Sequence, residues 1–196
     1  MQPDSALEPD APAQSSGISV IWNADPAVPG GVNGNVTVTE ASFQVEQLEL
    51  LSDAGDDHTI HSGYQLHWDS NTAPPPDVFP DAPVAVYQKI SLDIRPGFQQ
   101  QQQYAYEIRG TWRNNDGELK PFEIVDTAGL SISIDCSVAL RVGGMSSVAI
   151  RVDLENALNS VDFANVNEQD GMKLLNSGPL LMNFHNQMTH AFELDH

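Results

Sequence analysis

The chain has 196 residues, and its 27 acidic and 8 basic side chains give a formal net charge of −19. A surface with so few lysines and arginines cannot neutralise a row of phosphates, so the composition argues against a nucleic-acid-binding protein and against docking on anionic lipid. The length predicts one domain, because a folded unit of about 150–180 residues buries enough surface to form a core without disulfides.

The first 17 residues are rich in proline, alanine, serine and aspartate. Such a segment cannot bury enough apolar surface to fold, so we expect residues 1–17 to be a disordered tether and residues 18–196 to be the folded domain. A segment of this kind is typical of the stretch between a cleaved export signal and a domain. It predicts a periplasmic or cell-surface protein whose tether could carry a lipid anchor. The alternative is the ragged terminus of a cytosolic protein.

The single cysteine excludes an internal disulfide. Cys136 falls on the apolar positions of an alternating run, which favours a buried structural thiol over a nucleophile or a metal ligand. The sequence also has no run of about 18 apolar residues, so it predicts no transmembrane segment.

Apolar and polar residues alternate with a period of two from residue 18 onward, which is typical of strands in a half-buried sheet. Ile18 to Trp22 forms the first short strand, and a loop rich in glycine, proline and asparagine follows it. Residues 36–51 predict one long strand or two, because their apolar positions change parity and such a change indicates a bulge or a break. Residues 59–68 predict a weaker strand.

Five prolines in residues 71–83 exclude a helix or a central strand there, and clearer alternation follows. One strand is expected to place Tyr104, Tyr106 and Trp112 on a single apolar face, ahead of a hairpin turn at residues 114–117. The remaining strands are expected at residues 84–94, 122–124, 130–140 and 148–154. The pattern predicts an all-β fold, an antiparallel β-sandwich of about eight or nine strands.

The C-terminal part changes its apolar period from two to between three and four. Pro179 suits the first position of a helix. The apolar side chains that follow it recur at helical spacing: Leu181, Phe184, Met188 and Phe192. We therefore expect one amphipathic helix over residues 179–193 that packs on the sandwich.

The six histidines fall in two short windows, one within residues 58–67 and one within residues 185–196. On an unbroken strand, His61 and His67 share parity and face one side. If the C-terminal helix docks beside that strand, His185 lies close to both of them.

Imidazole combined with a thioether suits copper better than zinc or magnesium. Met182 and Met188 lie three residues before and after His185, on the same side of the expected helix. The sequence thus predicts a copper site made by His61, His67 and His185, with a methionine as an added ligand. The alternative is that these histidines are structural.

Common catalytic and cofactor-binding signatures are absent. The chain has no Gly-x-Ser-x-Gly elbow, no His-Glu-x-x-His, no phosphate-binding glycine loop and no dinucleotide fingerprint. We expect an exported, non-enzymatic binding module without catalytic residues. Two alternatives stay open: a structural or adhesive surface lipoprotein without a small ligand, and an enzyme whose site is assembled from separate loops.

Four short segments within residues 36–165 carry a shared strand-and-turn pattern, and they are Tyr64–Trp68, Phe79–Pro83, Tyr106–Thr111 and Pro121–Ile124. Together they resemble poorly characterised exported bacterial lipoproteins with a β-sandwich core, which implies the fold and no activity. The pair His67 and Trp68 is similar, more distantly, to a feature of the surface copper-binding proteins of methane-oxidising bacteria. Those proteins use histidines together with a tryptophan oxidised to kynurenine, so the similarity implies copper as the ligand and Trp68 as the residue to test for oxidation.

Overall fold

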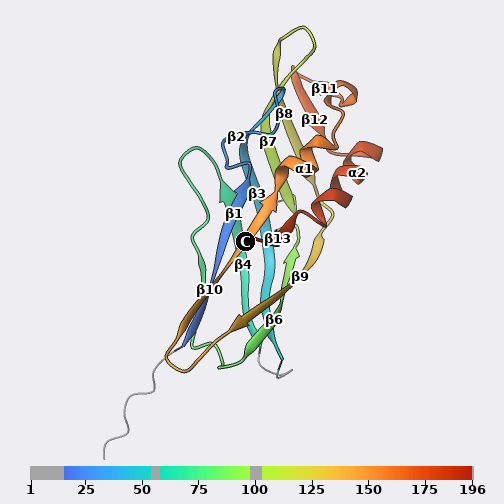
Figure 1. The fold of residues 1–196 in the computed structure, drawn as a ribbon. Coiled ribbons are helices and arrows are strands. Elements are labelled where there is room, and N and C mark those ends of the chain that lie inside the picture. Colours follow the sequence, from blue (N-terminus) through green and yellow to red (C-terminus); the bar gives the residue numbers. More distant parts are fainter. Residues whose placement is uncertain (1–15, 54–57, 98–102, 196) are drawn as a thin grey trace, which may run out of the picture.

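The computed structural model describes residues 16–53, 58–97 and 103–195 of the chain (Figure 1). Strands make up about 55% and helices about 12%, in two sheets and two helices. The predicted all-β sandwich is thereby confirmed. Most of the tether predicted for residues 1–17 lies outside the described residues, and Gly17 already begins the first strand.

One layer of the sandwich is a four-stranded sheet, here called the small sheet, in the order β13-β10-β1-β5. Its strands are β1 (Gly17–Asp25), β5 (Asp77–Pro80), β10 (Met145–Asp153) and β13 (Phe192–Leu194). The pair β1 and β10 is parallel, whereas the other two pairs are antiparallel. The small sheet is therefore mixed, although the sequence predicted antiparallel strands throughout.

The other layer, here called the large sheet, follows the order β11-β12-β8-β7-β3-β6-β9, with β2 and β4 joined to β3. Its strands are β2 (Gly30–Gly31), β3 (Val36–Ser52), β4 (His58–Trp68), β6 (Val86–Ile94), β7 (Tyr106–Arg113), β8 (Leu119–Asp126), β9 (Leu130–Ala139), β11 (Glu168–Gln169) and β12 (Met172–Leu175). Residues 41–43 of β3 pair with both β7 and β4, and most residues from 45 to 51 pair with both β6 and β4. Strand β4 therefore lies on one edge of β3, and β7 and β6 follow one another along the other edge.

Strand β3 changes the face that it turns to the core twice, as its apolar pattern predicts. The first change follows Val38, where the pairing with β7 shifts register. At the second change, Phe43 and Val45 are buried before it and Leu48 after it, and the pairing with β6 shifts register just after Val45. The register between β3 and β4 is continuous, so β4 turns over at the same level. Gly63 lies there with a φ of 74°, a conformation that glycine adopts readily and other residues rarely. We call this level the face reversal.

The centre of the core is Phe43, which is fully buried. Its ring meets Trp68 and Phe192 edge-on, with centroid distances of 6.1 and 5.4 Å. It lies 6.0 Å from the ring of Tyr106. One side chain of β3 thus contacts β4, β7 and β13, which belong to both sheets.

The aromatic face predicted for residues 104–112 is formed only in part. Tyr106 is buried, but Tyr104 is exposed because β7 begins two residues after it. Trp112 is partly buried under the 3-10 helix Phe163–Asn165, where its ring stacks on Phe163. The ammonium of Lys173 lies over the ring of Trp112, 5.6 Å from its centroid.

The helix α2 (Gly178–Met188) contains the predicted amphipathic stripe and buries Phe184. Pro179 lies in its first turn, as expected. The helix ends at Met188 rather than near residue 193, because the chain turns through residues 189–191 and enters β13.

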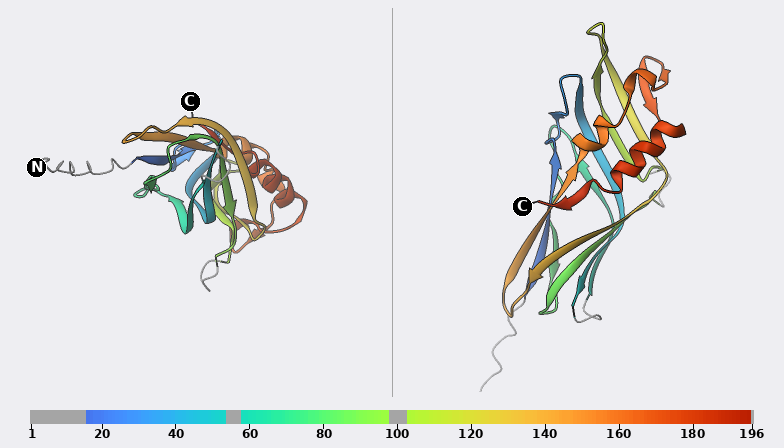
Figure 2. Two further views of the ribbon diagram at one scale, coloured as in Figure 1. Left: turned by 90° about the horizontal axis from the view of Figure 1, so that it is seen from below. Right: turned by 45° about the vertical axis from the view of Figure 1, so that its right-hand side comes forward.

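A second helix, α1 (Leu154–Asn159), was not predicted and follows β10 directly. The side chain of Asp153 accepts a hydrogen bond from the backbone N–H of Asn156 and so caps its first turn. Figure 2 shows α1 and α2 close together on one flank of the upper half of the molecule. Neither helix is long and apolar enough to cross a membrane.

Candidate functional site

His61 lies beyond the face reversal of β4, where it pairs with the buried Leu48 of β3. Its Nδ1 is 3.0 Å from Oδ1 of Asp77, a buried carboxylate at the start of β5. Oδ2 of Asp77 accepts a hydrogen bond of 2.6 Å from the indole N–H of Trp22. The ring of His61 stacks on Tyr64 with centroids 4.9 Å apart. Asp77 thus ties β4 of the large sheet to β1 of the small sheet.

His67 lies on the other side of the face reversal, and its two neighbours in β4 are buried. It therefore points away from the core. In the pairing of β4 with β3, His67 lies opposite Ser42. Its Nε2 is 3.2 Å from Oδ2 of Asp69. Oδ1 of Asp69 accepts hydrogen bonds of 2.7 Å from the backbone N–H groups of Asn71 and Thr72. The bond from Asn71, followed by the contact with His67, holds the pKa of Asp69 below its usual value.

His185 lies on α2, with its Nδ1 2.9 Å from Oδ2 of Asp126. The same buried oxygen accepts a hydrogen bond of 2.7 Å from the hydroxyl of Tyr106, and the rings of Tyr106 and His185 are stacked. Burial, and then Asp126, raise the pKa of Tyr106, so its hydroxyl stays protonated at neutral pH. This arrangement fastens α2 to the large sheet.

The structure does not bring His61, His67 and His185 together as the predicted copper site requires. The face reversal puts His61 and His67 on opposite faces of β4, and β3 separates β4 from the strands that His185 contacts. Met188 is buried and Met182 is exposed, so the two sulfur atoms lie in different environments. Across residues 16–53, 58–97 and 103–195, no three His, Cys, Asp or Glu side chains form a group that could hold a metal ion. Copper binding by any one of these histidines stays a prediction.

Cys136 is half-buried rather than buried as predicted. Its thiol donates a weak hydrogen bond to the backbone oxygen of Tyr87, at 3.4 Å. Burial, and then the charge of Asp135, raise the pKa of the thiol, which disfavours the reactive thiolate. The side chain is partly open because β9 is the last strand of the large sheet.

A groove of about 430 Å³ crosses the outer face of the large sheet at the face reversal. We call it the polar groove, after the polar side chains that line it from β3, β4 and the segment following β6: Gln44, Glu46, Ser62, Gln65 and Arg95. Val45, Tyr64 and Pro96 form an apolar part of its lining. Gln44 and Gln65 occupy directly opposite positions of β3 and β4. Their side chains therefore begin side by side on the floor, because the Cβ atoms of directly opposite residues on one face are about 5 Å apart.

A smaller hollow of about 80 Å³ adjoins the polar groove on the side of β7. It shares Gln44 and Gln65 with the groove and adds Ser42, Tyr104 and Glu107. Tyr104 is partly exposed and offers the face of an aromatic ring next to the amides. The combined surface carries the amides of Gln44 and Gln65 together with three aromatic side chains, Tyr64, Tyr104 and Tyr106.

Three carboxylates surround one guanidinium beside the smaller hollow. Arg109 of β7 is 2.5 Å from Glu107, 2.9 Å from Glu123 and 3.2 Å from Glu40. A single positive charge cannot balance three negative ones. Burial, and then a hydrogen bond with the carboxyl group of Glu123, raise the pKa of Glu107 to about 7.

The raised pKa of Glu107 predicts a pH-dependent contribution to stability. An acid whose pKa is higher in the folded state stabilises the fold below its unfolded pKa and loses that contribution as pH rises through the folded pKa. The loss should fall between the usual value of 4.5 and about 7. We expect Glu107→Gln to raise the urea midpoint relative to the parent at pH 8, and to raise it less at pH 5. An equal effect of the substitution at both pH values would contradict this account.

The sequence interpretation missed the polar groove and the carboxylates around Arg109. A sequence signal exists for part of it, since Gln44 and Gln65 fall on the polar positions of their strands, but only the register shows that they are neighbours. Comparison of the chain with models of protein families, with curated proteins and with solved structures finds no match. The site is therefore interpreted from its own geometry.

Proposed function

We propose that this protein is an exported, non-enzymatic binding module that holds a polyhydroxylated ligand, such as the end of a glycan, in the polar groove. The observation that carries the proposal is the pair of opposite amides, Gln44 and Gln65, on the floor of the groove. A carboxamide offers donors and an acceptor at once, so two adjacent amides match neighbouring hydroxyl groups.

The rest of the groove fits the same class of ligand. Glu46 and Arg95 lie at the groove 3.7 Å apart, so each charge has an opposite charge beside it. A neutral ligand that both donates and accepts hydrogen bonds suits such a lining better than a highly charged one. The ring of Tyr104 in the adjoining hollow provides a surface on which a sugar ring can pack. The volume of the groove lies within the range of small-ligand sites, about 300–1,000 Å³.

The arrangement of the carboxylates favours binding over glycoside hydrolysis. Hydrolysis by paired carboxyl groups needs one to give a proton to the substrate and the other to face the sugar. Glu107 and Glu123 are instead bonded to each other and both are held by Arg109. Their oxygens are thus occupied by protein partners.

The test is a titration with soluble oligosaccharides built from glucose, galactose, mannose or N-acetylglucosamine, followed by calorimetry. We expect at least one of them to bind the parent chain. Gln65→Ala should weaken its binding about tenfold, which corresponds to the loss of one hydrogen bond of about 1.4 kcal/mol. Gln65 is exposed, so the substitution should leave the fold intact.

Gln187→Ala is the matched control, since Gln187 is an exposed glutamine on α2 and outside the groove. Its binding should equal that of the parent. The proposal fails if none of the oligosaccharides binds at millimolar concentration, or if Gln65→Ala and Gln187→Ala bind equally well.

A further inference from the structure

The two sheets are not closed along one side of the sandwich. Strand β9 ends the large sheet and pairs only with β6. In the small sheet, β10 pairs with β13 only from Ile150 to Val152. Among the described residues, the outer edge of β9 and the outer edge of β10 from Met145 to Val148 therefore have no strand partner, whereas the inner edge of β10 pairs with β1 along its whole length. We call the space between these two edges the seam.

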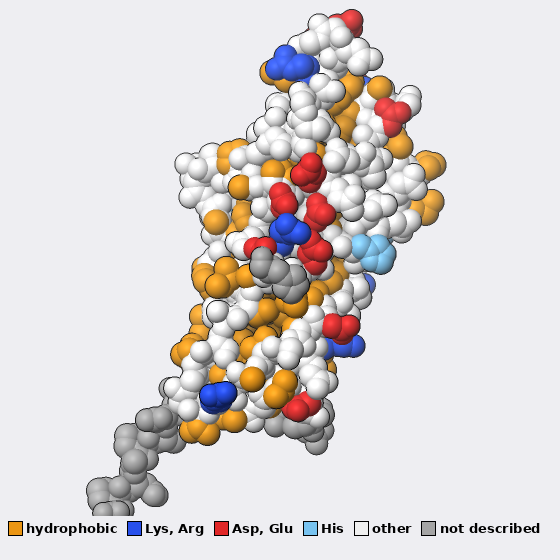
Figure 3. Space-filling view, viewed as in Figure 1, with side chains coloured by type: hydrophobic (Ala, Val, Ile, Leu, Met, Phe, Trp, Pro, Cys, Tyr) orange, Lys and Arg blue, Asp and Glu red, His pale blue; other side chains and the backbone are white. Residues whose placement is uncertain are grey.

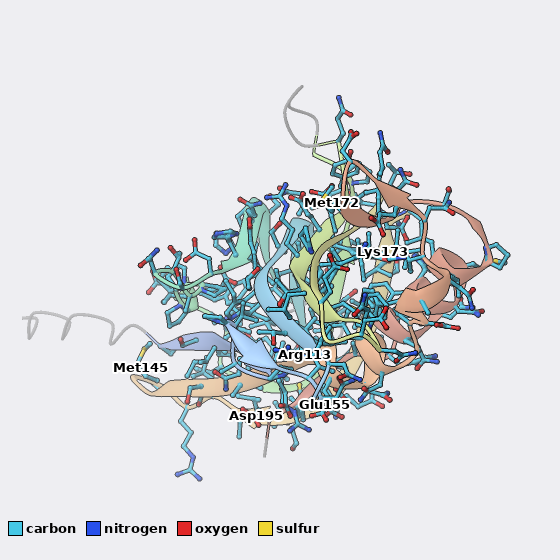
Figure 4. The ribbon with its side chains drawn as sticks, turned by 90° about the horizontal axis from the view of Figure 1, so that it is seen from above. Arg113, Met145, Glu155, Met172, Lys173 and Asp195 are labelled. Carbon is cyan, nitrogen blue, oxygen red and sulfur yellow. The ribbon has the colours of Figure 1, made fainter. Side chains whose placement is uncertain are left out.

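The seam holds two hollows of about 440 and 540 Å³, which share Asp135, Leu194 and Asp195. Their lining is mixed, and its apolar side chains, here called the floor, come from β9, β10 and β13: Ile134, Cys136, Val138, Val148, Ala149 and Leu194. Figure 3 shows this face, with apolar side chains extending downward from a group of acidic side chains around a basic one. Figure 4 shows Met145, at the start of β10, and Asp195 on the same flank of the molecule.

The rim of the seam is acidic. Arg151 is held by Asp25 and Glu193, and Asp195 and Asp135 line the hollows beside it. The rim thus carries four carboxylates and one guanidinium, so its net charge is negative. An occupant that carries positive charge is favoured here, because acidic side chains at the rim attract it and repel an acidic one.

We propose that the seam binds an extended segment of a partner protein as an added strand, with alternate apolar and basic side chains. Unpaired strand edges offer backbone donors and acceptors that a further strand satisfies. The side chains of a strand alternate between its two faces, so apolar residues can meet the floor while lysines or arginines meet the rim. This surface shares no residue with the polar groove, and the inference goes beyond the ligand proposed there.

A second copy of this chain is the less favourable occupant. Each copy carries a formal net charge of −19, and two such surfaces repel one another on close approach. A basic segment gains from the same field. The charge therefore selects a different protein as the source of the strand.

The probe is a synthetic peptide of about nine residues in which valine and lysine alternate, long enough to span one strand. Cys136 reports occupancy directly, since it is the single cysteine and lies on the floor of the seam. At a peptide concentration ten times Kd, we expect its modification by a thiol reagent to slow about tenfold. A peptide alternating valine and glutamate, and the lysine peptide N-methylated at alternate backbone nitrogens, should protect Cys136 far less.

Val138→Lys places a positive charge on the floor and should weaken binding of the lysine peptide at least about tenfold. Val142→Lys is the matched control, because Val142 is exposed in the turn after β9; its binding should equal that of the parent. Circular dichroism verifies that both variants fold. If either variant does not fold, the protection of Cys136 still tests the proposal, because that experiment uses the parent chain.

Three results would overturn the proposal. The first is that the lysine peptide neither binds at millimolar concentration nor protects Cys136. The second is that the acidic or N-methylated peptide protects Cys136 as well as the lysine peptide does, or that the Val138→Lys variant binds the lysine peptide as tightly as the parent does. The third is that Cys136 becomes protected as the concentration of the chain alone rises, with a dimer in light scattering, which would assign the seam to a second copy.

Discussion

Phe43→Ala is expected to lower the free energy of unfolding by about 3–5 kcal/mol, the usual range for truncation of a buried phenylalanine. The ring is fully buried and meets Trp68, Tyr106 and Phe192 at centroid distances between 5.4 and 6.1 Å. These partners come from three different strands, so a collapse of one of them into the space cannot restore the contacts of the others. The cavity should therefore remain largely open, which places the cost in the upper part of this range.

Urea denaturation at pH 7 measures this difference. Leu119→Ala is the matched control, since Leu119 begins β8 and is 55% exposed. It should change the free energy of unfolding by less than about 0.5 kcal/mol, as most exposed substitutions do. A midpoint for Phe43→Ala within error of the parent would mean that this ring is not the centre of the core.

The local parts of the fold were predictable from the sequence because they depend on neighbouring residues. Period-two alternation located most of the strands, Pro179 located the start of α2, and the parity change within residues 36–51 located the bulge of β3. The parallel pairing of β1 with β10 was not predictable. It joins segments more than 120 residues apart in the sequence, and alternation shows which face of a strand is buried without showing its neighbour.

The candidate site illustrates the same limit. His61 and His67 share parity in the sequence, but the turnover of β4 near Gly63 moves them to opposite faces. A glycine inside a strand pattern is itself a signal of a bulge, so this correction could have been anticipated. The juxtaposition of Gln44 with Gln65 could not, because it depends on the register between two strands.

Asp77→Ala is expected to lower the free energy of unfolding by about 2–4 kcal/mol at pH 7. Asp77 is 6% exposed and Trp22 is 4% exposed, so no water readily replaces the carboxylate as the acceptor for the indole N–H. A buried donor left without a partner costs about 1–3 kcal/mol. His61 also loses its carboxylate partner, but its ring is partly exposed and water can compensate there. The substitution removes a link between the two sheets as well as a hydrogen bond.

The pH dependence of this loss tests whether Asp77 also acts on the ionisation of Tyr64. Burial, and then the charge of Asp77, raise the pKa of Tyr64 above its usual 10.0. A group whose pKa is raised in the folded state contributes stability at pH values below its pKa in the unfolded state. This contribution is lost as the pH rises above that unfolded-state pKa. Without Asp77 the pKa of Tyr64 is raised less, so the variant has less of this contribution to lose. The gap between parent and Asp77→Ala should therefore be constant from pH 7 to about 10 and narrow above it.

Urea denaturation across this pH range measures the gap, and absorbance titration of the tyrosines follows the phenolate directly. Asp116→Ala is the matched control, since Asp116 lies exposed in the turn between β7 and β8. It should leave both the stability and the tyrosine titration unchanged. If Asp77→Ala is as stable as Asp116→Ala, the carboxylate is not the link between β4 and β1. If the gap persists unchanged above pH 10, the loss comes from packing and the hydrogen bond of Trp22 rather than from any coupling to Tyr64.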